Sequence, residues 1–105
     1  MLFNNAHKFD PQDIVTMKLV NGDEIVTEIV EDAAMYYMVR RPQTVVPSAK
    51  GMGLMPSLFT GKENAEIMLS KQHVMLAAAS VDEMVRHYLV TTTGIEPVTR
   101  GSIIS

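Results

Sequence analysis

The sequence predicts a mostly β domain, a small bent antiparallel barrel of about five strands with one C-terminal amphipathic helix. Residues 14–30 contain two β-rich runs joined by Asn21-Gly22, which is the strongest short-range signal for a hairpin. Further short apolar runs follow at 35–41, 44–46, 54–59, 65–70 and 73–79, with turn-forming residues between them. A single helical pattern comes after the last run. Strands of this kind hide their edges by closing into a barrel.

The 105 residues predict a single domain spanning 1–105, with the barrel at about 14–79, the helix at about 80–92 and tails at 1–9 and 95–105. The chain has no cysteine, so disulfides, thiolate metal sites and a cysteine nucleophile are excluded. The net charge of −3 means that the whole-molecule field does not attract a polyanion. A nucleic-acid role would therefore depend on local positive charge.

No apolar run approaches the ~18 residues of a membrane span. The first ten residues also lack the basic and apolar segments of a signal peptide. We therefore expect a cytoplasmic protein that does not contact a membrane. The nine methionines indicate either flexible core packing or an adaptable contact surface.

The hairpin is expected to have a two-residue type I′ turn, in which Asn21 and Gly22 both take a positive φ. In the strand before it, Val15, Met17 and Leu19 share one face by the period of two. The sequence therefore predicts that this face of the strand contributes to the core.

Local signals also mark the other segments. Residues 10–13 predict one helical turn, because proline follows a capping acid. The second face of the strand at 23–31 is only half apolar, with two glutamates beside two valines, which predicts a bend. The strand that precedes Pro42 should end, bulge or lie on an edge there, and 54–59 should be an irregular or edge strand. Apolar residues occupy both faces of the strand at 73–79 instead of alternating with polar ones, which is typical of a strand buried on both faces. In a domain this small, one of these faces would need a cover such as another subunit.

The helix carries a clear start and stop. Ser80 and Glu83 have the spacing of a capping box, and Gly94 is placed to end the helix. The apolar stripe between them consists of Val81, Met84, Val85, Tyr88 and Leu89.

Two stretches, KLVNGDEIVTEIVEDAAMYYMV and LSKQHVML, resemble the two motifs of the Sm-like superfamily of Sm, LSm and Hfq proteins. The first has an apolar strand, Asn-Gly, a second strand, an acid and an apolar residue that opens the third strand. The second has a strand, a short basic turn and a final strand. The resemblance covers about residues 14–79 and is nearest in shape to small phage-type members, since the helix follows the barrel instead of preceding it. Tyr36 stands where the family often has a base-contacting Asn, and Lys71-Gln72-His73 resembles the Lys-His turn of Hfq only loosely.

The resemblance implies an Sm-like or SH3-like barrel that joins copies of itself edge to edge in a homo-oligomeric ring of about five to seven subunits. It implies the host cytoplasm as the location if the protein is of phage origin. The interface candidates are Ile67, Leu69, Val74, Met75 and Leu76.

A nucleic-acid site is expected where aromatic and basic residues gather, because single strands bind by base stacking in a positive groove. The candidates are Asp32, Tyr36, Tyr37, Arg40, Arg41, Lys71, Gln72 and His73. Two alternatives stay open. In the first, one tyrosine belongs to the core and the arginines are solvated strand-end charges; in the second, Asp32 forms only an Asx turn.

No catalytic arrangement is found in the sequence. His7, His73 and His87 lack metal-ligand spacing, so we expect no metal and no cofactor. We expect a non-enzyme, a ring-forming module that binds single-stranded RNA, or DNA, in RNA or DNA processing. The alternatives are a structural or adaptor ring that binds protein partners, and an unrelated monomeric barrel.

Overall fold

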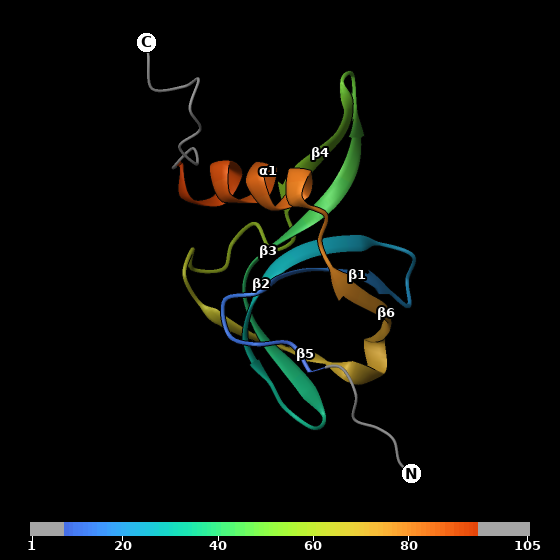
Figure 1. Cartoon of the computed structure of the whole chain (residues 1–105), viewed down its shortest axis with the longest axis vertical. Helices are drawn as coiled ribbons and strands as arrows, with labels where there is room; N and C mark the ends of the chain where they lie inside the picture. The colour runs from blue at the N-terminus through green and yellow to red at the C-terminus, as the bar shows by residue number, and fades with distance from the viewer. Residues whose placement is uncertain (1–7, 95–105) are drawn as a thin grey trace.

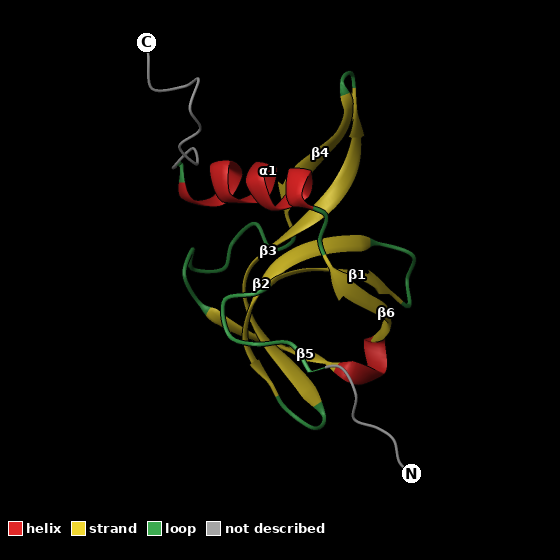
Figure 2. Cartoon of the chain, viewed as in Figure 1, coloured by secondary structure: helices red, strands yellow, loops and turns green. Residues whose placement is uncertain are grey.

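A computed structural model describes residues 8–94 of the chain (Figure 1). The elements in order are β1 (Ile14–Leu19), β2 (Glu24–Asp32), β3 (Tyr36–Ser48), β4 (Gly51–Pro56), β5 (Glu66–Ser70), the 3₁₀ turn η1 (Lys71–His73), β6 (Val74–Ala79) and the helix α1 (Asp82–Thr93). Figure 2 shows the helix lying beside the long β3–β4 hairpin, with the other strands curled below it. None of the described helices is long and apolar enough to cross a membrane.

All strand pairs are antiparallel, in the order β4-β3-β2-β1-β6, and β5 pairs with the first half of β3. The predicted fold class is confirmed: a bent, mostly β sheet with one C-terminal helix. The described part of the chain has six strands, because the apolar residues before Pro56 form the regular strand β4. The sheet curls round but does not close, since β5 and β6 do not pair with each other.

The predicted hairpin is β1–β2, but its predicted turn type is wrong. Asn21 has an ordinary φ, and only Gly22 takes a positive value, +95°. Gly22 N–H donates to the Leu19 carbonyl at 2.9 Å, and Leu19 N–H donates to the Asp23 carbonyl at 2.8 Å. These bonds define a three-residue loop with a glycine bulge, the next most common hairpin connection.

The helical turn predicted at residues 10–13 is also absent. Asp13 N–H donates to the Asp10 carbonyl at 3.0 Å, and Gln12 has φ +78°. A proline followed by a positive φ is typical of a type II β-turn. The expected tail at 1–9 does not include Phe9, because Phe9 packs against the core. Residues 1–7 and 95–105 lie outside the described part.

The core lies between β1, β2 and β3 and contains Val15, Met17, Ile25, Ile29 and Val39. The predicted core face of β1 is therefore confirmed. The expected bend of β2 is confirmed as well, since the β2–β3 register shifts twice and residues of both faces of β2 are buried.

The strand β3 passes through Pro42 with a bulge. Val26 faces Gln43 and Glu28 faces Arg40, so Arg41 and Pro42 together lie opposite a single β2 residue. Arg41 takes φ +51°, a left-handed value that is uncommon outside glycine. Of the alternatives predicted at Pro42, the bulge is the one observed.

The helix ends at Gly94 as predicted, with φ +74° and its N–H bonded to the Val90 carbonyl. The predicted capping box is wrong. The N-cap position is Val81 without a side-chain cap, and the Ser80 hydroxyl lies 2.7 Å from the Thr16 hydroxyl of β1. Tyr88 is the only residue of the apolar stripe that is fully buried.

The strand β6 is not buried by this chain, although both of its faces are apolar. Ala77 and Ala79 lie opposite the buried residues Met17 and Val15 of β1, yet both alanines are exposed. The sheet remains open at this edge, so burial of both faces of β6 by another subunit stays a prediction.

Candidate functional site

Two turns meet at one end of the sheet. The β2–β3 turn and η1 are joined by a hydrogen bond of 3.0 Å from Lys71 N–H to the Met35 carbonyl, and Tyr36 faces Ser70 in register. This contact brings together six of the eight predicted site residues from two parts of the sequence. They are Asp32, Tyr36, Tyr37, Lys71, Gln72 and His73.

Asp32 is a buried structural acid. Its side chain is 3% exposed, and its Oδ1 accepts from Lys71 Nζ at 2.6 Å while Oδ2 accepts from Phe9 N–H at 2.9 Å. Both oxygens are thus used by distant groups, and not by an Asx turn. Asp32 ties the N-terminal segment to η1 and does not present a free carboxylate.

The two adjacent tyrosines have different environments. Tyr37 packs against the core, 6.2 Å from the Phe9 ring, and Lys71 Nζ lies 4.6 Å from the Tyr37 ring centroid. Burial raises the pKa of the Tyr37 hydroxyl, and the Lys71 charge offsets part of this rise. Tyr36 is half-buried and, as the next residue on a strand, points to the other face. The interpretation of one tyrosine as a core residue therefore holds for Tyr37, and Tyr36 is the aromatic ring that could meet a ligand.

His73 and Gln72 are exposed residues of η1 beside Lys71. The Ser70 hydroxyl accepts from Gln72 N–H at 3.2 Å, and the His73 carbonyl accepts from Val20 N–H at 2.9 Å. Since their backbones are fixed in this way, both side chains can be presented to a ligand without reordering of the turn.

Arg40 and Arg41 do not belong to this site. Tyr36 and Arg40 are four residues apart on β3, or about 13 Å at ~3.3 Å per strand residue. Arg40 bonds to Glu28 Oε2 at 3.4 Å and to Glu66 Oε2 at 3.0 Å. Arg41 bonds to Glu28 Oε1 at 2.6 Å and to Asn64 Oδ1 at 2.7 Å. The predicted nucleic-acid role is unsupported for both residues, and the alternative of solvated strand-end charges fails as well, because both are half-buried and paired.

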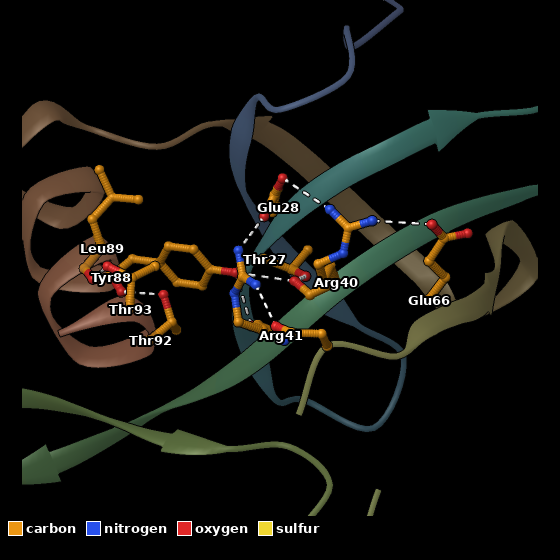
Figure 3. A network of polar contacts seen from close by, with 10 residues as sticks. Thr27, Glu28, Arg40, Arg41, Glu66, Tyr88, Leu89, Thr92 and Thr93 are labelled. Atoms are coloured by element: carbon orange, nitrogen blue, oxygen red, sulfur yellow. Dashed lines mark hydrogen bonds and ion pairs between the residues drawn. The ribbon is translucent and has the colours of Figure 1, made fainter. Parts of the chain in front are cut away.

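Figure 3 shows Glu28 between the two guanidinium groups, with Tyr88 reaching toward them from the helix. The Tyr88 hydroxyl lies 3.0 Å from the Arg40 carbonyl and 2.9 Å from the Arg41 carbonyl, to which it donates. Burial raises the pKa of Tyr88 to about 12. In the sequence, Tyr88 is only one member of an apolar stripe, and no local signal marks its hydroxyl as the contact that holds the helix to the β3 bulge.

The five interface candidates fall into two groups. One group is partly buried and packs against the core; it consists of Ile67, Leu69 and Val74. Met75 is 61% exposed and Leu76 is exposed to a similar extent, on a strand that pairs only with β1 within residues 8–94. The exposed Met68 of β5, whose strand pairs only with β3 among the described residues, belongs with this second group and was missed in the sequence.

Within residues 8–94, no group of three His, Asp or Glu side chains is placed to hold a metal ion. Comparison with models of protein families gives no match. Comparison with curated protein sequences likewise gives none. The Sm-like resemblance thus rests on the residue pattern alone.

Proposed function

We propose that this chain is an Sm-like module that assembles into a closed ring and binds single-stranded nucleic acid, RNA or DNA, in RNA or DNA processing. Two open strand edges in one chain support the assembly. Within the described residues, β5 pairs only with β3, and β6 pairs only with β1. Each strand therefore has a row of backbone donors and acceptors without a strand partner, which favours pairing with another chain.

Head-to-tail pairing of β6 with β5 of a second copy would satisfy both edges at once. It would also cover Met75, Leu76 and Met68, which are exposed in the single chain. Such a contact between two different surfaces generates a ring when the rotation closes.

The ligand side of the proposal is supported by the position of the two turns. Tyr36, Gln72 and His73 lie at the end of the sheet where β5 leads into β6, so pairing of these strands would repeat the three side chains at each subunit contact. Stacking on an aromatic ring contributes ~1–3 kcal/mol per base. Repetition around a ring multiplies such weak contacts.

Assembly is tested by native mass spectrometry of the full chain before and after nuclease treatment. We expect a mass of about five to seven subunits. Met75→Asp places a charge on the open edge and should give a monomer, whereas the control Met52→Asp, on an exposed residue of β4, should leave the ring intact. A monomeric wild-type chain would refute the assembly.

Binding is tested by fluorescence anisotropy with U-rich and A-rich strands. Tyr36→Ala should weaken binding about tenfold while the fold stays intact, which corresponds to the loss of one stacked base. The phosphate contribution should show as a steep loss of affinity with added salt. Absence of binding at low salt would remove the nucleic-acid part of the proposal and leave the ring.

The second candidate is a structural or adaptor ring that binds protein partners. Charge pairing favours it, because Arg40, Arg41 and Lys71 all lie against carboxylates and leave little free positive charge beside Tyr36. Exposed methionines, such as Met35 of the β2–β3 turn, suit adaptable protein contacts. Recovery of a protein partner that resists nuclease treatment, by a ring that binds no oligonucleotide, would select this candidate.

A further inference from the structure

Methionine is the only sulfur-bearing residue type in this chain, which has nine methionines and no cysteine. Four methionines of the described part are exposed, by between 61% and 68%: Met35, Met52, Met68 and Met75. Met17, by contrast, is fully buried in the core. Because an oxidant must reach the sulfur, the four exposed thioethers are the ones that a peroxide in solution can oxidise.

Two of these four methionines lie on the open edges of the sheet. Met68 belongs to β5 and Met75 to β6, and within residues 8–94 these strands pair only with β3 and β1. The other two lie elsewhere, Met35 in the β2–β3 turn and Met52 on β4. Oxidation of Met68 and Met75 therefore alters the open edges, whereas oxidation of Met52 does not.

The backbone accounts for the exposure of both edge methionines. Met68 stands between two residues that pack against the core, so by the period of two it points to the outer face of β5. Met75 lies at the bulge where the β1–β6 register shifts between Lys18 and Leu19, and it has no partner residue on β1. The extra residue of a bulge is left unpaired. The two thioethers are thus held at the edges and away from the core.

Oxidation changes the chemistry of these side chains without changing their charge. A hydroperoxide breaks its O–O bond and transfers one oxygen to the sulfur; hydrogen peroxide leaves as water. The sulfur loses two electrons and the peroxide gains them. The product is a sulfoxide, a polar group in place of an apolar one. Burial of such an oxygen in an apolar contact without a hydrogen-bond donor is unfavourable.

We propose that Met68 and Met75 are oxidation sites that control assembly: sulfoxides at the two edges keep the subunits apart, and reduction of the sulfoxides restores the ring. This assignment rests on the proposed ring, since it gives a regulation to the contact between β5 and β6 of neighbouring copies. Each contact would cover one Met68 and one Met75. The single chain is therefore the form that is oxidised, and its sulfoxides prevent its return to the ring.

The test is treatment of the full chain with hydrogen peroxide, at a protein concentration where the untreated chain forms the ring. Peptide mass spectrometry should find sulfoxides at Met68 and Met75, and native mass spectrometry should find a monomer. The concentration needed for half-assembly should rise at least about tenfold. Treatment with methionine sulfoxide reductases of both stereospecificities should restore the ring. The circular dichroism spectrum should stay that of the folded chain, since Met17 is buried.

Matched variants identify the responsible sulfurs. The double variant Met68→Leu with Met75→Leu keeps apolar side chains of similar volume and removes both thioethers. It should form the ring and keep it after peroxide, although Met35 and Met52 are still oxidised. The control Met52→Leu removes one equally exposed thioether from β4, so it should lose the ring after peroxide as the wild-type chain does.

The outcomes separate this proposal from the assembly on which it rests. A chain that is monomeric before treatment would refute the ring, and the oxidation switch with it. A wild-type ring that persists after peroxide would overturn the switch alone, whether or not Met68 and Met75 have been oxidised. Loss of the ring in the peroxide-treated double leucine variant would also overturn it, because the sensitive group would then lie elsewhere.

Discussion

Replacement of Tyr88 by phenylalanine tests how the helix is fixed to the sheet. Tyr88 is the only fully buried residue of α1, and its hydroxyl donates to the carbonyls of Arg40 and Arg41. The Arg40 carbonyl also accepts from the Thr27 hydroxyl at 3.0 Å, so it keeps one donor in Tyr88→Phe. The Arg41 carbonyl accepts from the Tyr88 hydroxyl at 2.9 Å. The variant therefore takes a donor away from this buried carbonyl, while the ring still fills its space.

An unsatisfied buried acceptor costs about 1–3 kcal/mol of unfolding free energy. Because the bulge can relax, we expect about 1–2 kcal/mol for Tyr88→Phe. In a domain of this size, each kcal/mol lowers the melting temperature by about 4–8 °C. Urea unfolding followed by circular dichroism measures the change, at matched protein concentration because assembly also adds apparent stability.

The matched control is Tyr36→Phe, which makes the same chemical change on β3, at a half-buried residue. No hydrogen bond of the Tyr36 hydroxyl is found within residues 8–94, so its loss should cost less than about 0.5 kcal/mol. If Tyr88→Phe and Tyr36→Phe unfold at the same urea concentration, the hydroxyl does not fix the helix, and the helix is held by apolar packing alone.

Three further predictions concern stability measured by urea unfolding. Burial raises the pKa of the Tyr88 hydroxyl from 10.0 to about 12, so this hydroxyl ionises at a lower pH in the unfolded chain than in the folded one. The free energy of unfolding should therefore fall by about 2–3 kcal/mol between pH 10 and 12, and Tyr88→Phe should not show this fall. Gln12→Gly relieves the positive φ of a non-glycine residue and should add about 0.5–1 kcal/mol, whereas Gly22→Ala, at φ +95°, should lose at least about 1 kcal/mol. Asp32→Asn leaves Lys71 without its carboxylate and weakens the bond from Phe9 N–H, so it should cost about 1–3 kcal/mol, and an unchanged midpoint would contradict the structural role given to Asp32.

The elements that the sequence predicted are those decided by local chemistry. The period of two in β1 identified Val15 and Met17 as core residues, because strand geometry leaves no other arrangement of the faces. Pro42 cannot donate to a ladder, which predicted a strand end, a bulge or an edge position, and the bulge is the one observed. Gly94 predicted the left-handed end of the helix.

The errors arise where a distant partner decides between local alternatives. Asn21-Gly22 suits both a type I′ turn and a three-residue loop with a glycine bulge, and the register of the strands selects the second. Ser80 has the spacing of a helix cap, but the pairing of β6 with β1 brings it next to Thr16. The Ser80 hydroxyl therefore hydrogen-bonds to the Thr16 hydroxyl instead of capping the helix. Neither choice is visible in a local window of sequence.

The candidate site was predicted in part for the same reason. The resemblance placed Asp32, Tyr36 and Lys71 together, and the meeting of the two turns confirms that proximity. It did not separate them from Arg40 and Arg41, because a basic residue in a strand looks the same whether it is free or paired. The pairing depends on Glu28, whose face could be read from the sequence but whose position opposite Arg40 could not.

The proposed strand-binding site depends on repetition of Tyr36, Gln72 and His73 around the ring, because β5 leads into η1 beside Tyr36 at the edge that a second copy would cover. The monomeric variant Met75→Asp should therefore lose most of its affinity for single strands. Retention of that affinity in a monomer would show that one chain suffices for strand binding and that repetition adds nothing.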